Sequence, residues 1–131
     1  KNILEKKYSS SNIKFLDIKT NRETLEIIKN SRAVITATRM YEVQPRLLCE
    51  ASSFAVPSIF PNFGGMSEYF PYDYKFSFEQ YDYNDLSEKI NLLNDENLLT
   101  QESKKVYEFI NHNLSNKKTI TDMDSFFFGG K

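Results

Sequence analysis

Short apolar runs that are rich in β-branched residues alternate along this chain with segments of helical spacing. Residues 33–37 form one such run, which is typical of a strand buried on both faces. Residues 12–17 and 57–60 predict two more strands, and residues 75–78 a weaker one. Strands that alternate with helices form a mainly parallel sheet with helices on its faces. The sequence therefore predicts an α/β fold.

The intervening segments carry the signs of helices. One helix is expected from Asn21 onward, with Asn21 or Thr20 as its N-cap. A second is expected to begin at Pro45, because proline suits the first helical position. Its inward-facing side chains should be Leu47, Leu48 and Ala51. Further helical segments are expected at residues 66–70, 83–94, 96–112 and within the tail, and the charged start, residues 1–8, is like the end of a helix.

Composition narrows the function classes. The chain has 131 residues, enough for one domain with one core, and its net charge of -1 gives no electrostatic reason to expect nucleic acid as the main partner. Cys49 is its one cysteine, so no intrachain disulfide can form. No run of about 18 apolar residues is present, which argues against a membrane-spanning helix. A lone His112 predicts no metal site. We therefore expect a cytoplasmic protein without a metal or other cofactor.

The parallel sheet also predicts where a ligand would bind. In open sheets of this kind, ligands bind beyond the carboxyl ends of the strands. The loops to examine are residues 17–21, 38–45 and 61–66, because each follows an expected strand. A bound ligand should lie against all three.

Between Glu42 and Glu68 the chain carries a continuous pattern of glutamates, a proline and two glycines. Seven residues separate Glu42 from Glu50, and the further fixed points are Ala51, Pro57, Gly64, Gly65 and Glu68. These spacings resemble those of the retaining glycosyltransferases of group 1 (family 4), which include sucrose synthases and bacterial mannosyl- and glucosyltransferases. The resemblance spans roughly residues 2–96.

The resemblance implies a fold and an activity. The fold would be the Rossmann-like C-terminal domain of a GT-B enzyme, apparently lacking its first two strands, with residues 1–131 as one partial domain and 115–131 as its C-terminal helix or tail. The activity would be retaining transfer of a hexosyl group from a UDP-, GDP- or ADP-sugar to a glycan or lipid, as in polysaccharide biosynthesis. The expected partners are the donor, a missing N-terminal acceptor domain and, for the full protein, a membrane surface. The 131-residue chain alone should transfer no sugar.

The resemblance also assigns roles to residues. Glu50 would accept hydrogen bonds from the ribose hydroxyls, which suits a carboxylate because it can accept two O–H donors at once. Glu42 would lie near the transferred sugar as the catalytic candidate. The remaining donor-binding candidates are Ile18, Arg39, Val43, Gln44, Arg46, Gly64 and Gly65. Arg46 could instead pair with Glu42 or Glu50, and Glu50 could be an ordinary helix glutamate paired with Arg46.

Two departures from the family keep other functions open. Val43 and Pro45 stand where the family has small residues or glycine, and Pro45 has no N–H to offer a phosphate. A degenerate, non-catalytic binding or scaffold module is therefore the alternative. A nucleotide-sugar epimerase of similar architecture is a third possibility, because a ribose-binding glutamate does not distinguish the two classes.

Overall fold

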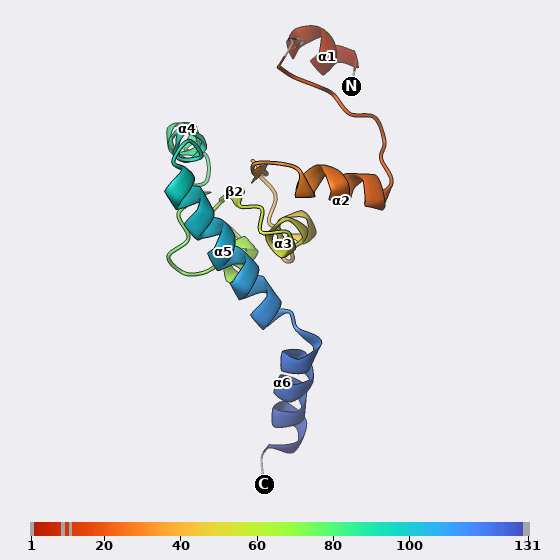
Figure 1. The fold of residues 1–131 in the computed structure, drawn as a ribbon, viewed down its shortest axis with the longest axis vertical. Coiled ribbons are helices and arrows are strands. Elements are labelled where there is room, and N and C mark those ends of the chain that lie inside the picture. Colours follow the sequence, from red (N-terminus) through yellow and green to blue (C-terminus); the bar gives the residue numbers. More distant parts are fainter. Residues whose placement is uncertain (1, 9, 11, 130–131) are drawn as a thin grey trace.

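The structure is a computed structural model that describes residues 2–8, 10 and 12–129, and Figure 1 shows how its elements are arranged. The first half contains α1 (Asn2–Tyr8), α2 (Asn21–Lys29), β1 (Val34–Ile35), α3 (Arg46–Ser53) and β2 (Ser58–Pro61). The second half contains the 3₁₀ helix η1 (Met66–Tyr69), β3 (Ser77–Phe78), α4 (Tyr83–Leu92), α5 (Glu96–Asn113) and α6 (Asn116–Phe128). The helical segments that the sequence predicts are all present in the described residues, with small shifts at their ends.

The three strands form one parallel sheet in the order β1-β2-β3. Val34 of β1 is paired with Ser58 of β2, and Phe60 of β2 with Ser77 of β3. All four residues of β2, the central strand, are buried. The predicted α/β fold, a Rossmann-like parallel sheet flanked by helices, is confirmed.

The prediction of a strand at residues 12–17 is wrong. This segment is extended but forms no ladder, and the backbone pairing found there is an isolated antiparallel bridge between Ser10 and Ile13. Ile13 and Leu16 are exposed. An alternating pattern becomes a strand only where a neighbouring strand satisfies its N–H and C=O groups, and no described strand lies beside this segment. The loop at residues 17–21 therefore does not follow a strand.

Two burial predictions are also wrong. Ile35 of β1 is 46% exposed, so this strand is not buried on both faces. Leu47 of α3 is 41% exposed, whereas Leu48 and Ala51 are buried as expected. Residues 47 and 48 are successive on a helix and lie about 100° apart, so one of them faces the core and the other does not.

A side-chain cap fixes where α2 begins, and α3 begins one residue later than predicted. Thr20 is the N-cap of α2: its hydroxyl accepts a hydrogen bond from the Glu23 N–H at 3.3 Å, and the Glu23 carboxylate accepts the Thr20 N–H at 2.9 Å. This reciprocal capping box confirms one of the two predicted N-caps. Pro45 is the N-cap of α3 and not its first helical residue, so α3 begins at Arg46.

The core lies between the sheet and helices α3 and α5, which pack against each other. It contains Leu48, Ile59, Phe60, Met66, Phe70, Tyr74, Phe76, Phe78 and Val106. A smaller cluster of Ile28, Ala51 and Val56 joins α2 to α3. These contacts hold the end of β1, the start of α3 and the loop after β2 in fixed relative positions.

Tyr74 completes the hydrogen bonding of β2 from within this core. Its hydroxyl donates to the Ser58 carbonyl and accepts the Ser58 N–H, each at 2.8 Å. β3 pairs with β2 only from Phe60 onward, so no described strand reaches Ser58 on that side, and the phenol takes the place of a strand neighbour. Burial raises the pKa of Tyr74 well above its ordinary value.

A buried carboxylate attaches the loop before β3 to α5. Glu102 is 1% exposed, and its carboxylate accepts the Lys75 N–H at 3.0 Å. Lys105 lies 2.9 Å from the Glu102 carboxylate and 2.8 Å from that of Asp73. The hydrogen bond from Lys105 lowers the pKa of Asp73. Buried charges of this kind are stable only when paired and hydrogen-bonded, as this one is.

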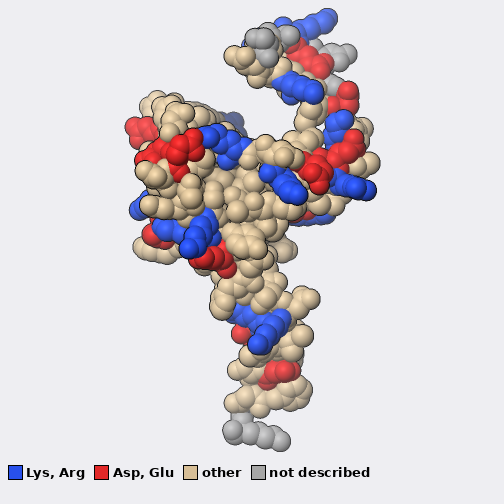
Figure 2. Space-filling model, viewed as in Figure 1, with Lys and Arg blue, Asp and Glu red and all other residues tan. Residues whose placement is uncertain are grey.

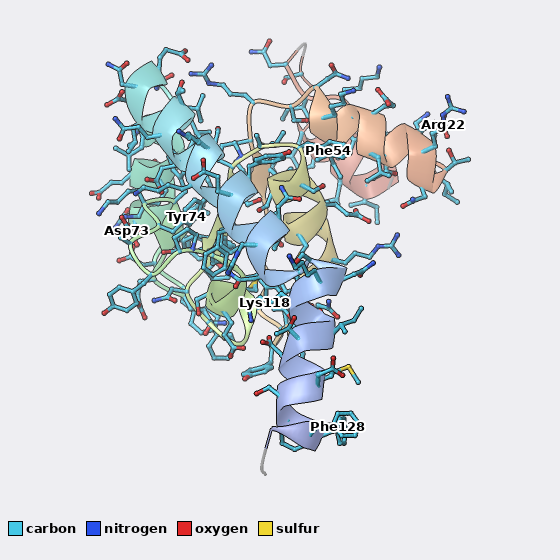
Figure 3. The ribbon with its side chains drawn as sticks, turned by 60° about the horizontal axis from the view of Figure 1, so that its bottom comes forward. Arg22, Phe54, Asp73, Tyr74, Lys118 and Phe128 are labelled. Carbon is cyan, nitrogen blue, oxygen red and sulfur yellow. The ribbon has the colours of Figure 1, made fainter. Side chains whose placement is uncertain are left out.

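Helix α6 extends away from the sheet (Figure 1), with Phe128 near its far end and Tyr74 within the body of the molecule (Figure 3). Most of its visible surface is uncharged in the space-filling view (Figure 2). Its exposed apolar side chains are Ile120, Met123, Phe126, Phe127 and Phe128. The prediction of a helix in the tail before Gly129 is confirmed.

Candidate functional site

The loops that carry Glu42 and the two glycines lie directly against each other. The Gly65 N–H donates to the Glu42 carbonyl at 2.8 Å. Gly64 has φ of +69°, a conformation that residues with a side chain rarely adopt. A Cβ added to Gly65 would lie 2.6 Å from the Val43 carbonyl oxygen. Both glycines are therefore needed for this close approach, and they fix the backbone on either side of Glu42.

A cavity of about 180 Å³ lies beside this contact. Its lining residues are Thr36, Glu42, Pro45, Arg46, Leu47, Leu48 and Met66. Thr36 comes directly after β1, so the cavity lies at the carboxyl end of that strand. This is the edge of the sheet at which the topology predicts a ligand.

The start of α3 faces the same region with backbone donors. No side chain caps α3, whereas α2, α4, α5 and α6 each have a side-chain N-cap. The Arg46 N–H donates to the Gln44 carbonyl at 3.0 Å. Among the described residues, none accepts a hydrogen bond from the N–H of Leu47 or Leu48. Free N–H groups and the positive end of the helix dipole favour an anion there.

Arg46 pairs with Glu50 and not with Glu42. Its Nε donates to Oε1 of Glu50 at 2.8 Å, one helical turn away. Its second guanidinium nitrogen, Nη2, donates to Oδ1 of Asn21 at 3.2 Å. The Glu50 side chain is 23% exposed, so the carboxylate is partly sheltered but still open to a ligand. From sequence, Asn21 is a possible N-cap and part of the loop at residues 17–21, but its contact with Arg46 spans 25 residues and has no local sequence signal.

The remaining predicted residues do not line the Glu42 cavity. Ile18 is fully exposed, and Val43 and Gln44 are exposed in the loop before α3. The Arg39 guanidinium lies over the ring of Tyr81, 5.6 Å from its centroid. Of the predicted site residues, Glu42 and Arg46 line the cavity, Gly64 and Gly65 contact the Glu42 loop, and Glu50 is linked to the cavity only through its pair with Arg46. Ile18 and Arg39 do not line it.

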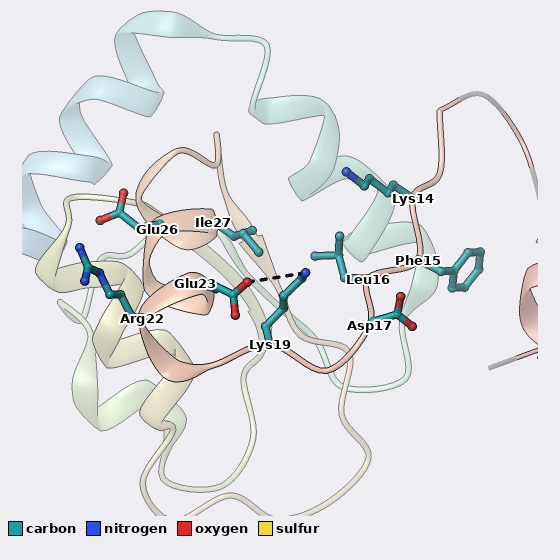
Figure 4. A pocket seen from close by; sticks show the side chains of 9 residues that line it. All are labelled: Lys14, Phe15, Leu16, Asp17, Lys19, Arg22, Glu23, Glu26 and Ile27. Carbon is teal, nitrogen blue, oxygen red and sulfur yellow. Dashed lines mark ion pairs between the residues drawn. The ribbon is translucent and has the colours of Figure 1, made fainter.

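A larger pocket, of about 520 Å³, lies between the extended segment at residues 14–19 and α2 (Figure 4). Its lining residues are Lys14, Phe15, Leu16, Asp17, Lys19, Arg22, Glu23, Glu26 and Ile27. In this pocket, Nζ of Lys19 lies 3.9 Å from Oε1 of Glu23. Hydrogen bonds from the N–H and the hydroxyl of Thr20 lower the pKa of Glu23. Because residues 12–17 are expected from sequence to pair as a strand, the sequence predicts a ligand against the loop at residues 17–21 but no pocket between this segment and α2.

Other kinds of site find little support in the described part of the chain. Burial raises the pKa of the Cys49 thiol, and the neighbouring Glu50 adds to the effect, so Cys49 is a poor nucleophile. Residues 2–8, 10 and 12–129 contain no group of three His, Cys, Asp or Glu side chains placed to hold a metal ion. Within the same residues, no helix has the length and apolar character needed to cross a bilayer.

The close contact at Gly65 gives a first prediction. Gly65→Ala should destabilise the fold by about 1–3 kcal/mol, because the new methyl group collides with the Val43 carbonyl and must push the Glu42 loop away. Chemical denaturation measures the loss. Ser67→Ala, an exposed position in the adjacent 3₁₀ helix, is the control and should change little. Equal stability of the two variants would show that the Glu42 loop is not held by this contact.

Comparison with known proteins gives one match. The model of the family described as glycosyl transferases group 1 matches residues 1–109. Neither the curated proteins nor the solved structures gave a match. The matched region contains the sheet, the Glu42 cavity and the Arg46–Glu50 pair. The chain therefore belongs to the glycosyl transferases group 1 family.

Proposed function

We propose that this protein binds a UDP-, GDP- or ADP-sugar and supports retaining transfer of the hexosyl group to a glycan or lipid acceptor. The observation that carries the proposal is the cavity at the carboxyl end of β1, where Glu42 and the uncapped start of α3 meet. A nucleotide sugar offers a diphosphate to the helix start and hydroxyl groups to the carboxylates. The family supplies the reaction class.

Each part of the site has a role in this proposal. Glu50 accepts the ribose hydroxyls, and the free N–H groups of Leu47 and Leu48 face the diphosphate. Glu42 lies near the transferred sugar. Catalysis then rests on holding the donor in position and on stabilising the negative charge of the departing diphosphate, with no metal required.

A cavity of about 180 Å³ holds only part of a nucleotide sugar. We therefore propose that the rest of the donor extends over the surface towards the Gly64 loop and residues 17–21, and that a separate N-terminal domain supplies the acceptor site. A cytoplasmic protein that associates peripherally with a membrane would suit a lipid or glycan acceptor.

A non-catalytic binding module is the second candidate, and Pro45 is the observation that favours it. As the N-cap of α3, Pro45 removes one N–H from the set that could face the diphosphate. Val43 projects an exposed, branched side chain from the same loop. A module of this kind would bind the nucleotide and release it unchanged.

Calorimetric titration with UDP, GDP and ADP tests the proposal. At least one of them should bind, and inorganic phosphate and the matching nucleoside should bind more weakly, because each offers only half of the ligand. Absence of binding by all three at millimolar concentration would refute it. A nucleotide that binds while none of its sugar derivatives is hydrolysed or transferred by the full-length protein would favour the binding module.

A further inference from the structure

Arg46 bridges two helices through different nitrogens of one guanidinium group. Nε contacts Glu50 within α3, and Nη2 contacts Asn21, the first residue of α2. Its planar group presents donors in fixed directions, which lets one side chain serve two acceptors at once. The contact with Asn21 goes beyond the ordinary ion pair that Arg46 and Glu50 form between successive turns of α3.

The Arg46 bridge contributes little to the stability of the fold. The Arg46 side chain is 76% exposed, and exposed ion pairs contribute little to stability because water screens them. What the bridge fixes is the direction of the Glu50 carboxylate. Oε1 is held by Arg46, and Oε2 accepts no hydrogen bond from the described residues. One oxygen is therefore anchored while the other remains available.

We propose that Arg46 and Asn21 are positioning residues that hold Glu50 in the orientation in which it accepts the ribose hydroxyls of the donor. This inference rests on the proposed function, and it changes the role of Arg46 from a direct donor contact to a support for Glu50. Holding the carboxylate in advance lowers the entropy lost when the nucleotide binds. The protein thereby distinguishes ribose from deoxyribose more sharply than an unsupported glutamate would.

The position of Asn21 gives the bridge a second consequence. Asn21 follows the capping residue Thr20 and the segment at residues 14–19, which forms one wall of the larger pocket. Arg46 therefore connects the start of α2, which follows that wall in the chain, to Glu50 in α3.

The test compares the affinity of the nucleoside diphosphate that binds best, among UDP, GDP and ADP, with that of its 2′-deoxy form. Wild type should prefer the ribose form by about 10- to 100-fold, the value of one hydrogen bond to a charged acceptor. Arg46→Met should reduce this ratio by about fivefold, and Asn21→Ala by less. Arg46→Lys should also reduce this ratio, because the single ammonium group of lysine cannot present donors to Glu50 and Asn21 in two fixed directions as the guanidinium group does.

Lys104→Met is the matched control. Lys104 is paired with Glu108 one turn further along α5, and its side chain is 76% exposed, as that of Arg46 is. It should leave the ratio unchanged, and all variants should keep the melting temperature of wild type. A ratio that stays constant or rises in Arg46→Met, or a full rescue by lysine, would overturn the inference. A wild type that binds no nucleotide, or binds both forms equally, would instead overturn the proposed function on which it rests.

Discussion

Tyr74→Phe should lower the free energy of unfolding by about 2–4 kcal/mol. The substitution removes one oxygen and leaves both the N–H and the C=O of Ser58 buried without a partner. Each unsatisfied backbone group in a protein interior costs about 1–3 kcal/mol. The ring itself remains in the core, so the loss reports the two hydrogen bonds and not a cavity. Urea denaturation measures it.

The control for Tyr74 is Tyr72→Phe. Tyr72 is fully exposed two residues earlier, and its loss of a hydroxyl should change stability by less than about 0.5 kcal/mol. A pH series adds a second readout. Burial raises the pKa of Tyr74 in the folded state above the ordinary value of 10.0, so wild type should lose stability as pH rises above about 10, and Tyr74→Phe should lack that part of the loss. Equal denaturation curves for the two variants would contradict the role given to the hydroxyl.

Glu50→Ala should weaken nucleotide binding by about 30- to 1000-fold. A carboxylate that accepts two ribose hydroxyls contributes about 2–4 kcal/mol, because hydrogen bonds to a charged acceptor are stronger than those between neutral groups. The fold should remain intact, since the partner left behind is the exposed Arg46. Calorimetric titration with the nucleoside diphosphate that wild type binds gives the comparison.

Glu88→Ala is the control for that titration. Glu88 lies on the exposed face of α4, away from both pockets, and its removal should change neither affinity nor stability. If Glu50→Ala bound the nucleotide as wild type does, Glu50 would be an ordinary helix glutamate. The Arg46–Glu50 pair would then be a surface ion pair and no more.

Local sequence signals predicted the helices well. The helix start at Thr20 or Asn21, the start of α3 beside Pro45 and the short helix after Gly65 were all predicted from residues within one or two turns of each other. The parallel direction of the strands, though not their order, followed from their alternation with helices. The spacing of Glu42, Glu50 and the two glycines pointed to the region in which the cavity lies.

Local sequence signals could not predict the features that depend on residues distant in the sequence. Residues 12–17 alternate as a strand does, but alternation says nothing about whether a partner strand lies alongside. The contact of Gly65 with Val43 and that of Arg46 with Asn21 join residues more than twenty positions apart. The hydrogen bonds between the Tyr74 hydroxyl and Ser58 also join residues that are distant in the sequence, 16 positions apart. Each of these contacts could be found only in the folded structure.

The order of the strands has a consequence for how the chain assembles. Because β1, β2 and β3 are neighbours in the same order as in the sequence, β2 and β3 each find an earlier partner strand already synthesised when they leave the ribosome. The pairing steps join Val34 to Ser58 and Phe60 to Ser77, spans of about twenty residues whose closure entropy is modest. These three strands can thus pair from β1 onward as translation proceeds. Of the elements that form its core, α5 arrives last, carrying Val106, and closes the core once the sheet is in place.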